Sequence, residues 1–267
     1  MTEAKLIKYL QIPRKPLTGT QHLAPIIISD SKGSYLRDQV VHSLDKNIHW
    51  QCKSGTTIQD QLKWLKTNIN NKVKQVGDIS VYIWSGTCNL TTRDKNGYIS
   101  LRSTSDDTVQ LILDKFHECI DIVKKYPHSK ITILEIPPYS IIKYNQKIAS
   151  KINNKKQNNH KDSNNNHTDL VAQSDIIDKY TEQETQLQQQ IVKVNDGIKY
   201  LNSTLGTKSP CFSIHLQSRR QRSRGKSKPT EKYINYNLYS DGIHPKRLLA
   251  KAWLGQISDL IQKDCWY

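Results

Sequence analysis

Residues 25–31 read PIIISDS, an apolar run that ends in three small polar residues. A short run of this kind is typical of a central parallel strand, which is buried on both faces. A hydroxyl placed directly after such a strand lies at the carboxyl edge of the sheet, where open α/β sheets bind their ligands. The stretch therefore predicts an α/β fold and makes Ser31 a candidate nucleophile.

The same pattern recurs along the chain. Four further apolar segments predict strands at 49–52, 79–84, 131–136 and 212–216. Between them, apolar residues repeat every three or four positions and predict helices over 36–44, 58–69, 109–123, 177–201 and 248–261. Because strands and helices alternate, we expect a doubly wound, flavodoxin-like three-layer sandwich around a parallel sheet of about five strands.

Composition shifts divide the chain. Residues 1–24 are charged and interrupted by prolines, which predicts an N-terminal arm before a single domain at 25–267. Residues 151–167 are nearly all Asn, Lys, Gln and His, so they cannot repay their ordering entropy and predict a disordered insertion. We interpret the helix at 177–201 as packing on the sheet, with a partner-binding seam as the alternative.

The overall charge is strongly positive. Forty Lys and Arg against 24 Asp and Glu give a formal charge of +16, which favours polyanionic partners or a solvated basic surface. The abundance of Asn and Lys is equally explained by the codon bias of an AT-rich genome. The five cysteines have no C-x-x-C spacing, which indicates reduced thiols rather than a disulfide framework or zinc site. With no predicted signal peptide or membrane span, we expect an intracellular protein, cytoplasmic or nuclear.

A second polar motif precedes the last predicted helix, where residues 241–244 read DGIH. A hydroxyl nucleophile needs a base and a group that orients the base, and one D-x-x-H turn supplies both. We therefore predict His244 as general base for Ser31 and Asp241 as its orienting carboxylate. The alternatives are that Ser31 caps a helix, and that 241–244 is an ordinary turn with a surface histidine before Pro245.

Two more candidate residues follow the second and third strands, and the set resembles the SGNH (GDSL-type) hydrolase family. That family is named for a Ser, a Gly, an Asn and a His in four separate blocks. The chain offers these in order as Ser31, Gly55, Asn89 and His244. The resemblance covers roughly residues 25–261, and it departs at Ser29, where the family usually has Gly.

The resemblance implies a serine esterase or acyl hydrolase that needs neither cofactor nor metal. It implies a Ser31–His244–Asp241 triad and an oxyanion hole made by the Ser31 N–H, the Gly55 N–H and the Asn89 side-chain amide. The substrate would be a small molecule or an acylated compound. From the residues alone, Gly55 is equally a turn glycine and Asn89 a loop residue that caps its own backbone, while Cys88 is interpreted as buried packing.

A basic loop at 218–232 is the strongest signal outside the candidate triad. Its cations would repel one another unless solvated or neutralised by phosphates, and nucleic-acid contact is predicted for Arg219, Arg220, Arg222, Arg224, Lys226 and Lys228. The alternatives are a solvated loop and a nuclear-import signal. An alternative function follows, namely a weakly active or inactive SGNH-fold module that binds RNA or DNA, resembling domains encoded by mobile elements. The sequence leaves the oligomeric state open.

Overall fold

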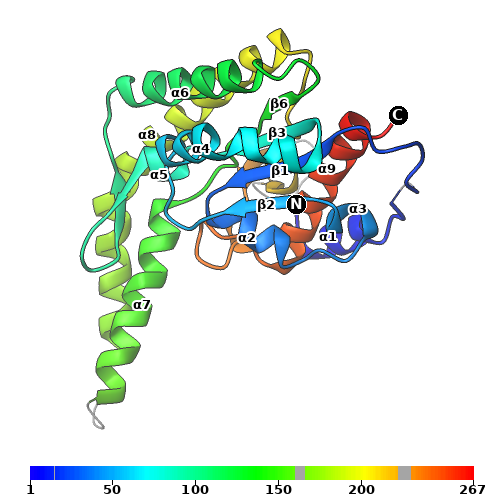
Figure 1. Ribbon diagram of the computed structural model, residues 1–267. Helices are drawn as coiled ribbons and strands as arrows, with labels where there is room; N and C mark the ends of the chain where they lie inside the picture. Colours follow the sequence, from blue (N-terminus) through cyan, green and yellow to red (C-terminus); the bar gives the residue numbers. More distant parts are fainter. Residues whose placement is uncertain (15, 160–165, 222–229) are drawn as a thin grey trace.

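The computed structural model describes residues 1–14, 16–159, 166–221 and 230–267. At its centre lies a parallel four-stranded sheet of order β2-β1-β3-β6 (Figure 1). Its strands are β1 (Ala24–Ser29), β2 (His49–Cys52), β3 (Ile79–Trp84) and β6 (Lys130–Ile133). The α/β fold and parallel sheet predicted from the sequence are confirmed.

Both faces of the sheet are covered by helices, as the apolar strands require. On β1, Ile26 and Ile28 join one hydrophobic cluster and Ile27 joins the other, because successive side chains point to opposite faces. The first cluster includes α4 (Ile58–Val76), α6 (Asp107–Val123) and α8 (Asn166–Thr204). The second includes α1 (Glu3–Leu10) and α9 (Arg247–Cys265), so the molecule has three layers (Figure 1).

The remaining elements are short or lie at the periphery. The helices are α2 (Ser31–Arg37), α3 (Ser43–Lys46), α5 (Thr87–Leu90), α7 (Ile141–Asn159) and the 3₁₀ turns η1 (Phe212–His215) and η2 (Tyr236–Leu238). Two antiparallel hairpins pair β4 (Thr91–Arg93) with β5 (Ile99–Leu101) and β7 (Gln217–Gln221) with β8 (Thr230–Ile234). None of the described helices is long and apolar enough to span a bilayer.

The predicted fifth strand at 212–216 is wrong, since these residues form η1 and then turn. The outer edge of β6 is instead paired by side chains of α8. Asn202 accepts the Ile133 N–H at 2.9 Å and donates to the Ile133 carbonyl at 2.7 Å. Asn195 does the same for Ile136, at 2.8 and 2.9 Å. These amides satisfy backbone groups that a fifth strand would otherwise pair.

Other boundaries also differ from the expectation. The helix predicted at 36–44 is two helices, because α2 ends at Arg37 and α3 begins at Ser43. The intervening residues include two consecutive valines, which are poor helix formers. The segment at 90–107, for which the sequence predicts no strand, contains the β4–β5 hairpin.

Residues of α7 and α8 complete the first cluster. These two helices pack against each other and project from the body of the molecule (Figure 1). Of the predicted disordered insertion at 151–167, residues 151–159 lie in α7 and 166–167 in α8, so these parts are helical. Residues 160–165 lie outside the described residues. Leu187, Val194 and Ile198 of α8 are buried in the cluster with the strands, as the packing interpretation predicts.

Candidate functional site

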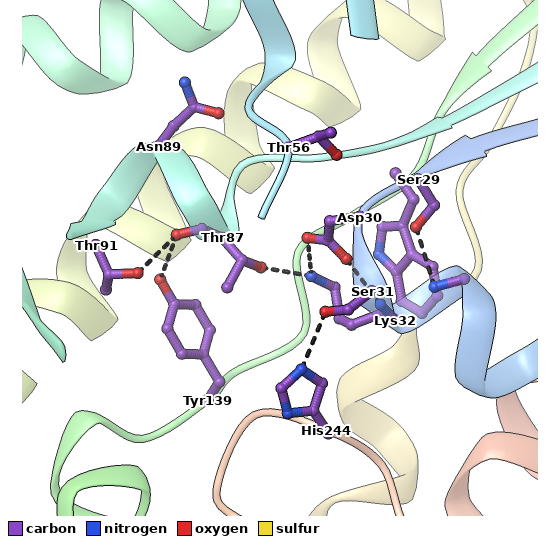
Figure 2. A network of polar contacts seen from close by, with 12 residues as sticks. Ser29, Asp30, Ser31, Lys32, Thr56, Thr87, Asn89, Thr91, Tyr139 and His244 are labelled. Atoms are coloured by element: carbon purple, nitrogen blue, oxygen red, sulfur yellow. Dashed lines mark hydrogen bonds and ion pairs between the residues drawn. The ribbon is translucent and has the colours of Figure 1, made fainter. Parts of the chain in front are cut away.

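The turn after β1 presents Ser31 at the carboxyl edge of the sheet. Asp30 is the N-cap of α2, and its carboxylate accepts the Lys32 N–H at 2.9 Å. Ser31 is therefore the first residue of the helix rather than its cap, and the capping alternative for this serine is wrong. With the cap supplied by Asp30, the Ser31 hydroxyl points into the network shown in Figure 2.

The departure at Ser29 has a local explanation. The buried Ser29 hydroxyl accepts the Gly33 N–H at 3.1 Å, which ties the first turn of α2 back to β1. A Cβ on Gly33 would lie 2.5 Å from the Cys52 sulfur and 2.7 Å from the Ser29 Cβ. Since such contacts are not tolerated, residue 33 must lack a side chain while residue 29 keeps its hydroxyl.

Ser31, His244 and Asp241 form one hydrogen-bonded chain. The Ser31 Oγ lies 3.0 Å from the His244 Nε2, and the His244 Nδ1 lies 2.7 Å from the Asp241 Oδ2. The structure thus brings Ser31 to the Asp241–His244 turn, although Ser31 and His244 are 213 residues apart in sequence. Such a chain allows an imidazole to accept a hydroxyl proton while a carboxylate fixes the orientation of the ring.

The Asp241 carboxylate is also held by its own loop. Its second oxygen accepts the backbone N–H of His244 at 2.8 Å and of Ile243 at 3.1 Å. Burial alone would raise the pKa of Asp241, but hydrogen bonds from the His244 ring and these backbone groups outweigh it and lower that pKa. The carboxylate is therefore kept ionised as a partner for a protonated imidazole.

Neighbouring elements fix the position of this loop. Gly242 has a φ of +91°, and a Cβ there would lie 2.7 Å from the Lys143 Cβ at the start of α7. The Ser140 N–H donates to the Gly242 carbonyl at 3.0 Å. On the other side, the Tyr35 ring stacks on the His244 ring, with centroids 4.9 Å apart. The loop is thereby packed between α7 and α2.

Tyr35 was not singled out from the sequence. It lies four residues after Ser31, so both side chains project from the same face of α2. This four-residue spacing is the sequence feature from which Tyr35 could have been predicted to lie near the site. Burial, followed by the charge of Asp241, raises the pKa of Tyr35, which keeps its hydroxyl neutral beside the imidazole.

Gly55 lies in the turn after β2, on the same edge of the sheet. Its φ is +76° and a Cβ there would meet nothing within 4 Å, so the position faces open space. The Thr56 hydroxyl donates to the Lys53 carbonyl at 2.8 Å and stabilises the turn. Within the described part of the chain, the backbone N–H groups of Gly55 and Ser31 have no hydrogen-bond acceptor.

Asn89 is placed differently from the prediction. Its carbonyl oxygen accepts the Ile58 N–H at 2.9 Å, and its amide donates to the Gln59 Oε1 at 2.8 Å. The residue is buried, and Figure 2 shows its amide directed away from Ser31. The donation from Asn89 to an oxyanion at Ser31 stays a prediction, while in the structure the Asn89 carbonyl oxygen caps the first turn of α4.

The Lys32 ammonium and the Cys88 thiol lie in the corner between the turns after β1 and β3. The buried Lys32 ammonium lies 2.5 Å from the Asp30 Oδ2 and 2.6 Å from the Thr87 hydroxyl (Figure 2). Sequence reasoning passed over Lys32, because lysines are seldom buried. Burial raises the pKa of Cys88 to about 11, so this thiol stays protonated, consistent with a packing role.

The predicted nucleic-acid contacts are only partly described. Arg219 and Arg220 lie in β7, and the side chain of Arg219 is exposed. Arg222, Arg224, Lys226 and Lys228 lie outside the described residues. In the part of the chain that is described, no three His, Cys, Asp or Glu side chains gather as metal ligands would.

No protein-family model matches the sequence, and no curated protein is similar to it. Solved structures with a similar fold exist. A GDSL-like lipase from Bacteroides thetaiotaomicron is 12% identical with a TM-score of 0.54, and the alignment covers 97% of each chain. A lipase/acylhydrolase from Enterococcus faecalis is 11% identical with a TM-score of 0.50, covering 91% of this chain and 97% of that one. The chain therefore shares the fold of GDSL-type hydrolases along nearly its whole length.

Proposed function

We propose that this chain is a serine-dependent hydrolase of carboxylic esters. The observation that carries the proposal is the hydrogen-bonded chain from Ser31 through His244 to Asp241, at 3.0 and 2.7 Å. It lies at the carboxyl edge of a parallel sheet, in the fold of the GDSL-type lipases and acylhydrolases. The substrate class is a small ester or an acylated compound.

The reaction proceeds in two halves. The Ser31 Oγ attacks the ester carbonyl carbon while His244 takes the hydroxyl proton. The carbon–oxygen bond to the leaving alcohol then breaks, and His244 returns the proton to that oxygen. A water molecule, deprotonated by His244, attacks the acyl-serine and releases the acid and the free Ser31 hydroxyl. Asp241 remains ionised and stabilises the protonated imidazole in both halves.

Two backbone groups are suited to stabilise the negative oxygen of the tetrahedral intermediate. The N–H groups of Ser31 and Gly55 have no acceptor among the described residues, and both follow adjacent strands at one edge of the sheet. Donors that lack partners in the free protein are available to a developing oxyanion. We assign the oxyanion hole to these two groups and leave Asn89 out of it.

Covalent labelling tests the proposal directly. A fluorophosphonate probe reacts with activated serines, and peptide mass spectrometry locates the adduct. We expect an adduct on Ser31 in the wild-type protein and none in Ser31→Ala. Ser34→Ala, three residues along the same helix, is the matched control and should label normally. Unchanged labelling of Ser31→Ala, or no adduct on folded wild-type protein, would contradict the proposal.

Nucleic-acid binding is a second candidate function, supported by one feature of the β7–β8 hairpin. Arg219 and Lys232 lie directly opposite each other across the two strands, and both are exposed. Like charges in this position destabilise a hairpin unless an anion neutralises them. An association with mobile elements stays a prediction from the sequence.

Salt dependence tests this second candidate. We expect affinity for single-stranded RNA or DNA to fall steeply with salt. The double variant Arg219→Gln/Lys232→Gln should lower the slope of log affinity against log salt by about 1 to 2. Binding that is absent, or that ignores salt, would remove the candidate. Lys66→Gln, an exposed cation on α4, serves as the control for loss of charge alone.

A further inference from the structure

The residue that follows Ser31 carries a buried charge. The Lys32 side chain is 3% exposed, and its ammonium contacts the Asp30 carboxylate at 2.5 Å and the Thr87 hydroxyl at 2.6 Å. The ammonium also lies 5.6 Å from the centre of the Trp84 ring. One side chain thus links the turn after β1 to the turn after β3, at the edge where Ser31 lies.

Stability does not explain this arrangement. Removing two charges from water carries a desolvation penalty that their attraction seldom exceeds, and well-packed apolar residues are often as stable in their place. The cap of α2 does not need the ammonium, because Asp30 already accepts the Lys32 N–H. Thr87 is held independently, since its carbonyl accepts hydrogen bonds from Tyr139 and Thr91.

The pair instead sets the charge beside Ser31. Asp30 precedes the serine and Lys32 follows it, and Figure 2 shows both charged groups gathered around the Ser31 turn. An unpaired carboxylate there would oppose formation of an oxyanion on Ser31 and would favour a protonated His244. The ammonium cancels that effect in a water-poor corner, where charges act strongly.

We propose that Lys32 is a positioning residue of the active site, whose ammonium neutralises Asp30 and keeps the environment of Ser31 favourable to loss of its proton. The proposal rests on the proposed function, in which Ser31 is the nucleophile and His244 the base. It adds a residue outside the Ser31–His244–Asp241 chain. With Asn89 committed to α4, the turn after β3 contributes to this corner through Thr87.

Other titratable groups surround the same corner. Asp241 and Tyr35 contact the His244 ring, from the loop before α9 and from α2. Cys52 from β2 and Cys88 from α5 lie within electrostatic range of Asp30, and burial keeps both thiols protonated. Asp241 is the charge in direct contact with the imidazole, Asp38 acts on the neighbouring Tyr35, and the Asp30–Lys32 pair flanks Ser31 in the sequence.

Two single substitutions separate charge from geometry. Lys32→Met keeps the length of the side chain and leaves Asp30 unpaired, whereas Asp30→Asn keeps a helix cap and leaves Lys32 unpaired. Both break the same ion pair, yet they change the local charge in opposite directions. The double variant restores neutrality. Lys66→Met, which breaks the surface pair with Glu118, is the control.

The measurement is the rate of fluorophosphonate labelling as a function of pH. We expect the pH of half-maximal labelling to rise in Lys32→Met and to fall in Asp30→Asn, each by about half a pH unit or more. Lys32→Met should also label at least about tenfold more slowly at pH 7. The double variant should return to the wild-type midpoint. Displacement of both single variants in the same direction, or of neither, would overturn the proposal.

A second readout separates this proposal from the proposed function. Titration of the His244 ring by NMR reports the local charge whether or not Ser31 reacts, and the same opposite displacements are expected. Failure of the wild-type protein to label would then count against the hydrolase alone. Melting temperatures check folding, and if Lys32→Met does not fold, Asp30→Asn and the double variant still give the required comparison.

Discussion

The turns after β1 and β3 lie side by side at one edge of the sheet, yet they use their polar side chains differently. After β1, Asp30 caps the helix and leaves the Ser31 hydroxyl to reach His244 at 3.0 Å. After β3, the Asn89 side chain is itself a cap, because it accepts the Ile58 N–H at 2.9 Å. The Ser31 side chain therefore faces the site, and the Asn89 side chain faces α4.

A motif residue is available for chemistry only when a neighbouring residue satisfies the hydrogen bonds of the local backbone. Asp30 is such a neighbour of Ser31, because its side chain accepts a backbone N–H of α2. In the first turn of α4, the backbone N–H groups depend on the side chains of Thr57 and Asn89. Helix N-termini leave several N–H groups without intrahelical acceptors, so a nearby amide is readily recruited. Substitutions in each of the two turns test this difference.

The largest effect is expected at His244. His244→Ala removes the base that Ser31 contacts, so fluorophosphonate labelling should fall on the order of 10⁴-fold or more. His42→Ala, an exposed histidine that caps α3 without a side-chain hydrogen bond, is the control and should label normally. Comparable labelling by the two variants would show that Ser31 reacts without a base.

Asp241→Asn should have the next largest effect. An amide keeps the shape of the loop but no longer stabilises a protonated His244, so the labelling rate should fall on the order of 10²- to 10⁴-fold. Asp38→Asn, an exposed carboxylate at the end of α2, is the matched control. A loss below about tenfold would mean that the Nδ1 hydrogen bond does not orient the ring.

Asn89→Ala tests the other side of the comparison. The Ile58 N–H loses its acceptor, so the free energy of unfolding should drop by about 1–3 kcal/mol in denaturant titrations. Labelling of Ser31 should change by less than about tenfold, whereas loss of an oxyanion donor costs about 100-fold or more. Asn68→Ala, within α4, controls for loss of an amide that bonds only its own helix. A large loss of labelling with unchanged stability would restore the donor role.

The smallest effect concerns two carboxylates, Glu184 of α8 and Asp241 itself. Burial raises the pKa of Glu184 above its usual 4.5, while hydrogen bonds to the start of α7 oppose this only in part. Its contribution to stability is thus present below pH 4.5 and is lost as pH rises through the raised pKa. Relative to Glu184→Gln, wild-type protein should lose stability as pH increases.

Asp241 should behave in the opposite way, so the two carboxylates together test the direction in which stability changes with pH. Its lowered pKa gives a contribution that is present above its usual 3.8 and is lost as pH falls. Denaturant titrations at several pH values measure both. The stability advantage of wild-type protein over Asp241→Asn should shrink on acidification, while that over Glu184→Gln should grow. The same slope for both variants would contradict the assigned environments.

The sequence alone predicted the features that depend on the periodicity of apolar residues and on the order of strands and helices along the chain. The alternation of buried strands and amphipathic helices predicted the parallel α/β sheet, and the strand-end positions of Ser31 and the D-x-x-H turn predicted the contact at 3.0 Å. Those features follow from where the carboxyl ends of parallel strands must lie.

What could not be predicted depends on partners far away in the sequence. The prediction of a fifth strand failed because Asn202 pairs Ile133 of β6 and Asn195 pairs Ile136 just beyond it, which no local pattern of residues 212–216 reveals. The contacts of Asn89 could not be predicted either, because its partners Ile58 and Gln59 lie in α4. Lys32 was passed over because the carboxylate and hydroxyl that make its burial tolerable come from two different turns.

The side-chain amides of α8 that pair backbone groups at the β6 edge also affect how copies of this protein can associate. A sheet that ends in open backbone groups is a template on which another chain can add a strand, and such addition leads to swapping and fibrils. Asn202 occupies the N–H and carbonyl of Ile133 in β6, and Asn195 occupies those of Ile136 just beyond the strand, each with the two functional groups of a single amide. These two residues therefore make the addition of another chain at this end of the sheet less favourable.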